Sequence, residues 1–130
     1  MKLAAFLVVA VTAPAFGQEG ASRTSWDGVY TAEQAGRGKQ VYKQACAACH
    51  PLDWYRGDVM KPWDGAPLLD LYDVIATTMP PSNPGSLKRR EYVDLLAYLL
   101  TLNDMPSGAD ELPTPPAALK KILIKWRNKP

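Results

Sequence analysis

Five residues, Cys46-Ala47-Ala48-Cys49-His50, decide how the rest of this 130-residue chain is interpreted. The two thiols, three positions apart, can add to the two vinyl groups on one edge of a porphyrin. The residue that follows then places an imidazole beneath the iron. Cys-X-X-Cys-His is the attachment signature of c-type haem. We therefore predict one haem c, covalently attached through Cys46 and Cys49, with His50 as an iron ligand.

Other chemistries of paired cysteines fit this sequence less well. A thioredoxin-like redox pair follows a strand in a βαβ unit, and no such unit is predicted. A structural zinc site needs four ligands, whereas the chain contains two cysteines and one histidine. A disulfide between Cys46 and Cys49 would span one helical turn and would constrain little.

The second iron ligand is sought among the remaining side chains. Because His50 is the single histidine, ligation by two histidines is impossible. Met60, Met79, Met105, a lysine and an open position remain. Histidine with methionine is a ligand pair of electron-transfer haems. Met79 is favoured because Pro80, Pro81 and Pro84 restrict its loop, whereas the other two methionines are expected in packing or surface roles.

Hydrophobic spacing predicts an all-α fold. Thr31 and Gln34 fit a capping box that starts a helix ending near Ala45. Gly38 in that helix is expected to allow the close approach of another helix. Two further helices are predicted over 67–77 and 87–102, the second with Ser86 as N-cap. The prolines and glycines of residues 51–66 indicate a loop.

The N-terminus has the pattern of an export signal. Lys2 precedes nine apolar residues, 3–11, and small residues follow up to Gly17. Nine apolar residues are too few to span a bilayer, which needs about 20. We predict a cleavable signal peptide and a periplasmic, soluble protein. The predicted division is a signal peptide (1–17), a flexible N-terminal arm (18–30), a haem domain (31–105) and a Pro-rich, basic extension (106–130).

Together these features resemble class I c-type cytochromes. The resemblance covers residues 31–104 and rests on CAACH, on Thr78-Met79-Pro80 and on the order of the helices. It implies three main helices wrapped around one haem, with Gly38 packed against Tyr98 or Leu95. It also implies that the Pro62 carbonyl accepts a hydrogen bond from the His50 ring.

The resemblance favours a one-electron carrier, not an enzyme, with iron ligated by His50 and Met79. One alternative is the electron-accepting subunit of a periplasmic dehydrogenase. Another is a haem enzyme or sensor with an open distal site. The expected partners are redox proteins, either a dehydrogenase or an oxidase. The formal net charge of +2 argues against nucleic-acid binding.

Two further features leave alternatives open. Arg56 or Trp63 could hydrogen-bond a haem propionate, or they could be a surface arginine and a core tryptophan. Residues 117–130 carry five cations and no acid. This segment could be solvated, could dock on its own domain, or could steer the protein to an acidic partner.

Overall fold

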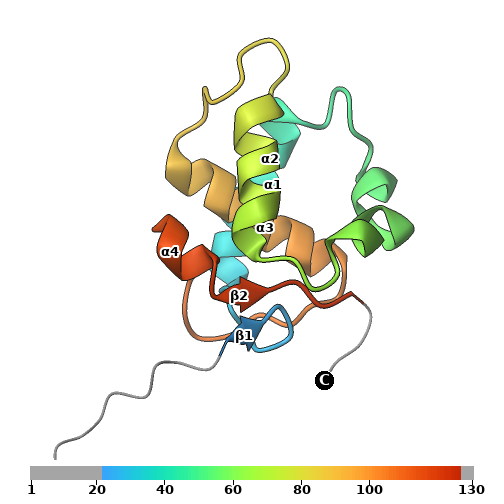
Figure 1. Ribbon diagram of the computed structural model, residues 1–130. Coiled ribbons are helices and arrows are strands. Elements are labelled where there is room, and N and C mark those ends of the chain that lie inside the picture. Colours follow the sequence, from blue (N-terminus) through green and yellow to red (C-terminus); the bar gives the residue numbers. More distant parts are fainter. Residues whose placement is uncertain (1–21, 127–130) are drawn as a thin grey trace, which may run out of the picture.

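The computed structural model describes residues 22–126 (Figure 1), so the predicted signal peptide lies outside the described residues. The three longest helices in this part of the chain are α1 (Ala32–Ala45), α2 (Leu68–Thr78) and α3 (Arg89–Leu102). The shorter elements are the 3-10 helices η1 (Leu52–Tyr55) and η2 (Gly57–Trp63), the helix α4 (Pro116–Leu119) and the strands β1 (Arg23–Thr24) and β2 (Ile122–Leu123). Between residues 22 and 126, none of the helices is both long and apolar enough to cross a bilayer.

The three predicted helices are confirmed, with shifts at their ends. The N-cap of α1 is Thr31, whose hydroxyl accepts a hydrogen bond from the Gln34 amide at 3.1 Å. The prediction of Ser86 as the N-cap of α3 is wrong. Lys88 takes this place, and the Glu91 carboxylate accepts from the Lys88 amide at 2.7 Å. The segment predicted as loop, 51–66, contains η1 and η2, because short 3-10 turns tolerate its prolines and glycines.

Helix α3 is the centre of the fold. Every residue from Tyr92 to Leu100 is buried, so this helix is covered on all sides. Helix α1 crosses it at Gly38, where a Cβ atom would overlap the carbonyl oxygen of Asp94. The close approach expected at Gly38 is therefore present, but its partner is the Asp94–Leu95 peptide, with the Asp94 carbonyl nearest to the glycine.

The described part of the expected flexible arm, from β1 onward, packs on the domain, and residues 18–21 lie outside the described residues. Val29 and Tyr30 are buried in the main core. The Tyr30 hydroxyl donates to the Met105 carbonyl at 2.5 Å. The turn before them is held by Asp27, whose carboxylate accepts from the amide and the hydroxyl of Thr24. The burial of Val29 and Tyr30 and the bond from Tyr30 to Met105 depend on residues far along the chain, so a polar, Gly- and Ser-containing segment does not reveal them.

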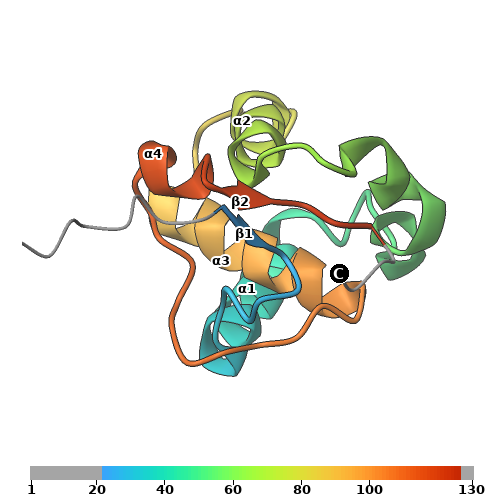
Figure 2. The ribbon, with the colours of Figure 1, turned by 60° about the horizontal axis from the view of Figure 1, so that its bottom comes forward.

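The C-terminal strap, residues 116–126, also packs on the domain. Its strand β2 pairs in parallel with β1, with Arg23 opposite Ile122. Figure 2 shows the strap running beside β1 and beneath α2. Three of its side chains lie at most 4% exposed: Leu119, Ile122 and Ile124. Of the three alternatives for the basic segment, docking on its own domain is the one that the structure bears out, up to residue 126.

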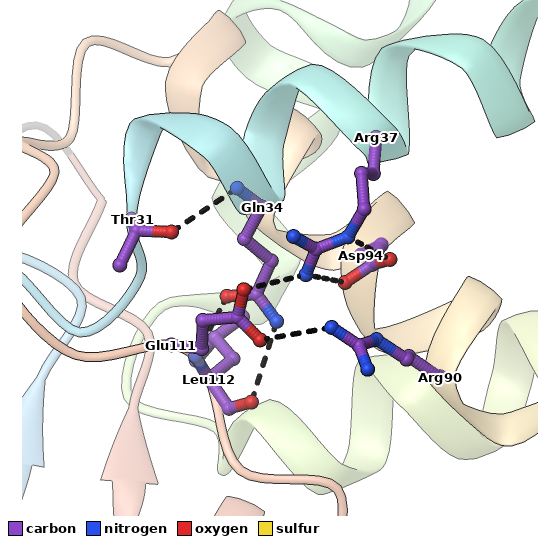
Figure 3. A network of polar contacts seen from close by, with 7 residues as sticks. All are labelled: Thr31, Gln34, Arg37, Arg90, Asp94, Glu111 and Leu112. Atoms are coloured by element: carbon purple, nitrogen blue, oxygen red, sulfur yellow. Dashed lines mark hydrogen bonds and ion pairs between the residues drawn. The ribbon is translucent and has the colours of Figure 1, made fainter.

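A polar network fastens the segment between α3 and the strap (Figure 3). Arg37 of α1 donates two hydrogen bonds to the Asp94 carboxylate, at 2.9 and 3.0 Å, and one to Glu111 at 2.7 Å. These two carboxylates, Asp94 above all, raise the pKa of Arg37. Glu111 is also 3.4 Å from Arg90. The network ties residue 111 to both α1 and α3.

The second half of the predicted capping box is wrong. The Gln34 side chain does not reach back to Thr31. It is 1% exposed and pairs with the backbone of Leu112, accepting from its amide at 2.7 Å and donating to its carbonyl at 3.3 Å (Figure 3). A buried amide side chain needs partners for both of its polar ends, and Leu112 supplies them.

Candidate haem-binding site

One cavity brings together the predicted ligands from two parts of the chain. Cys46, Cys49 and His50 line it from the end of α1, and Met79 lines it from the end of α2. The other lining side chains are mostly apolar: Ala45, Tyr55, Ile75, Pro81, Leu95 and Leu99. The described residues therefore place all four predicted site residues around one space.

The Cys-His segment continues α1 as a tight turn. The amides of Cys49 and His50 both donate to the Cys46 carbonyl, at 3.1 and 2.9 Å. The hydroxyl of Tyr42, one turn earlier in α1, donates to the His50 carbonyl at 2.5 Å. These bonds fix the backbone of the short turn that carries both thiols and the imidazole.

Aromatic rings surround the His50 side chain. The ring of Trp54 packs edge-on against it at 4.8 Å between centroids, and the ring of Tyr55 lies at 5.7 Å. The His50 Nδ1 atom is buried and has no hydrogen-bond partner in the structure. The bond from this ring to the Pro62 carbonyl, implied by the family resemblance, is therefore absent.

Met79 is held by its backbone on two sides. Its amide donates to the Ile75 carbonyl of α2 at 2.9 Å. Its carbonyl accepts from the Tyr92 hydroxyl of α3 at 2.8 Å. Met60 and Met105 are each 2% exposed and belong to the main core, so the structure confirms their packing role.

Arg56 and Trp63 are not brought into this cavity. Trp63 is half-buried against the main core. Arg56 is exposed and lines a separate open cavity of about 630 Å³ with Trp26 and Trp126. The structure thus agrees with the alternative of a core tryptophan and a surface arginine.

Burial sets the protonation of the groups around the cavity. It raises the pKa of the Cys46 thiol, so this thiol stays protonated to higher pH than an exposed one. It also raises the pKa of Tyr55 to about 12. In both groups burial disfavours the negatively charged form.

The donor set fits a covalently attached haem. Two thiols at the required spacing, one imidazole and one thioether meet in a space walled by aliphatic and aromatic side chains. Cys46 and Cys49 would hold the porphyrin edge, and His50 and Met79 would face the iron. Within residues 22–126 no group of three or more His, Cys, Asp or Glu side chains is placed to hold a metal ion.

Three polar side chains support the site in ways that the sequence alone does not predict. The Tyr42 and Tyr92 hydroxyls donate to the backbone carbonyls of His50 and Met79, roles that the helical spacing of these residues does not predict. Asn103, the C-cap of α3, donates to the Tyr55 carbonyl at 2.8 Å. The helical spacing of a tyrosine predicts that its ring is buried. The hydrogen-bond partner of its hydroxyl depends on the tertiary structure and cannot be predicted in this way.

Comparison with known proteins identifies the family of the chain. A family model described as cytochrome c oxidase, cbb3-type, subunit III matches residues 33–99, which is more than half of the chain. No curated protein and no solved structure gives a significant match. The matched residues contain the Cys-X-X-Cys-His segment, Met79 and most of α3. The chain therefore belongs to this family of c-type cytochrome domains and binds haem c covalently, through Cys46 and Cys49.

Proposed function

We propose that this protein is a periplasmic one-electron carrier whose haem iron is ligated by His50 and Met79. The observation that carries the proposal is that both side chains line one cavity together with Cys46 and Cys49. The haem would supply reversible one-electron oxidation and reduction at its iron, and the chain would supply the tether, the two ligands and an apolar surrounding.

Two ligands from the protein would leave no open coordination position for a substrate. That favours electron transfer over catalysis, in agreement with the c-type cytochrome family. A thioether ligand also raises the reduction potential of a haem relative to harder donors. A carrier of this kind suits acceptance of electrons from a dehydrogenase and delivery to an oxidase.

We further propose that the carrier works with a membrane-associated redox complex. The matching family is named for a subunit of a terminal oxidase. The predicted signal peptide, residues 1–17, would export the chain to the side of the membrane where such a cytochrome exchanges electrons. As the electron-accepting subunit of a dehydrogenase, the protein would carry out the same one-electron transfer with a different partner.

The ligation is tested by removing single sulfur atoms. In haem-loaded protein, Met79→Leu should abolish the weak long-wavelength sulfur-to-iron absorption band of the oxidised state and lower the reduction potential. Met60→Leu and Met105→Leu are matched controls, because both methionines are buried in the main core and leucine conserves most of their volume. The proposal fails if either control variant loses the band while Met79→Leu keeps it.

A further inference from the structure

We propose that Tyr92 is a positioning residue for the iron ligand Met79 and that its hydroxyl sets how firmly the thioether stays on the iron. This inference rests on the proposed ligation by Met79. It assigns a role to a side chain that is not among the residues lining the cavity and that bonds to the Met79 backbone.

The first observation is the anchoring of the Met79 backbone. The Tyr92 hydroxyl donates to the Met79 carbonyl at 2.8 Å, and the Met79 amide donates to Ile75 at 2.9 Å. The residue therefore joins α2 to α3 through its two backbone groups. With both groups engaged, the Met79 Cα has little freedom to move, and its side chain starts from a defined point on the cavity wall.

The second observation is that residues 81–86 make no hydrogen bond to a helix, although Pro81 and Pro84 restrict the backbone of this loop. Residues 81–86 are all exposed. Their backbone hydrogen bonds join Asn83 to Pro80 and Ser86 to Asn83, so these bonds shape the loop without tying it to a helix. The bond from Tyr92 is thus the polar link between α3 and the start of the ligand loop.

The third observation is that Tyr92 itself is rigidly placed. It is 3% exposed, on the most deeply buried helix of the fold. Its ring packs edge-on against that of Tyr72 of α2 at 6.0 Å between centroids. A hydroxyl on a fixed ring can position its acceptor, whereas a hydroxyl on a mobile side chain would follow it.

The hydroxyl matters because a thioether is a displaceable ligand. Whenever the sulfur leaves the iron, an external base competes for the position, and the competition depends on how well the loop holds Met79 in place. Loss of one buried hydrogen bond of this kind should shift that competition by about threefold to tenfold. Overall stability would change as well, so a readout at the iron is needed.

Imidazole binding to the oxidised, haem-loaded protein provides that readout. Titration with imidazole, followed by loss of the sulfur-to-iron band, measures how readily Met79 is displaced. Tyr92→Phe should bind imidazole about threefold to tenfold more tightly than the parent protein. Tyr72→Phe is the matched control, because it removes a hydroxyl from the neighbouring ring and leaves the bond from Tyr92 to Met79 intact.

The outcomes separate this inference from the proposed function. If the parent protein lacks the sulfur-to-iron band, ligation by Met79 is wrong and the role of Tyr92 falls with it. If the band is present but Tyr92→Phe binds imidazole like the parent protein, ligation stands and the positioning role is refuted. Equal tightening in Tyr72→Phe and Tyr92→Phe would also refute it, because the effect would then come from packing between the rings.

Discussion

Gly38 shows how the absence of one atom brings two helices together. Its backbone lies against the Asp94–Leu95 peptide of α3, where a Cβ atom would overlap the Asp94 carbonyl. Gly36, on the same helix, is exposed and has open space where its Cβ would be. Glycine at position 38 therefore allows the two helices to pack closely. At position 36 it has no packing role, and its flexible backbone only lowers the stability of the helix.

Substitution of these two glycines should have opposite effects. Gly38→Ala should lower the free energy of unfolding by about 1–3 kcal/mol or more, because the backbone of α3 must shift. Gly36→Ala should raise it by about 0.4–1 kcal/mol, because alanine restricts the unfolded chain and fits a helix. Urea unfolding of the haem-loaded proteins measures both values. If the two variants changed stability equally, the close crossing at Gly38 would be refuted.

At the scale of elements, the C-terminal strap closes one side of the core. The Ile124 amide donates to the Ala66 carbonyl at 2.9 Å, and the Gly65 amide donates to the Ile124 carbonyl at 2.8 Å. On the other side, the Lys125 amide donates to the Ser25 hydroxyl at 3.0 Å. The strap therefore bridges the segment before α2 and the segment before α1. Steering by its exposed lysines stays a prediction.

Loss of strap packing should cost more stability than loss of strap charge. Ile124 is fully buried, so Ile124→Ala should lower the free energy of unfolding by about 2–5 kcal/mol. Lys120 is exposed on the same segment, and Lys120→Ala should change it by at most about 0.5 kcal/mol. Thermal unfolding provides the comparison. A strap that is merely solvated would show the same small change for both variants.

At the scale of the whole molecule, the cavity draws on all three main helices. Its wall includes Ala45 of α1, Ile75 of α2 and Leu95 of α3. A haem tethered there would contact each helix and stabilise their mutual packing. The covalent attachment is therefore expected to affect the stability of the entire domain and not only the motif that carries it.

The attachment is tested by replacing both thiols. The parent protein, matured in an exporting host, should keep its haem after denaturation and show a mass increase of one haem. Cys46→Ser combined with Cys49→Ser should retain no haem after denaturation and should unfold at a lower temperature, because the tether to the cavity is lost. Exported parent protein with two free thiols and no added mass would contradict the covalent attachment.

The cofactor, the three main helices and the ligand candidates could be predicted from the sequence because each depends on local information. The haem-attachment motif Cys-X-X-Cys-His consists of five consecutive residues. The apolar residues of one helical face are spaced three to four positions apart. Met79 could be favoured since its prolines lie in the same loop. The close approach at Gly38 also needed only a small residue on a predicted helix.

The tertiary structure alone decided which distant groups meet. Gln34 has the spacing of a capping residue, yet its amide binds Leu112, 78 positions away. Tyr92 has the spacing of a core residue, yet its hydroxyl reaches Met79. The strap has the composition of a solvated tail, yet Ile124 is buried. In each case a side chain satisfies its polar groups or removes apolar surface from water by contact with residues remote in sequence, and only the folded chain determines which residues those are.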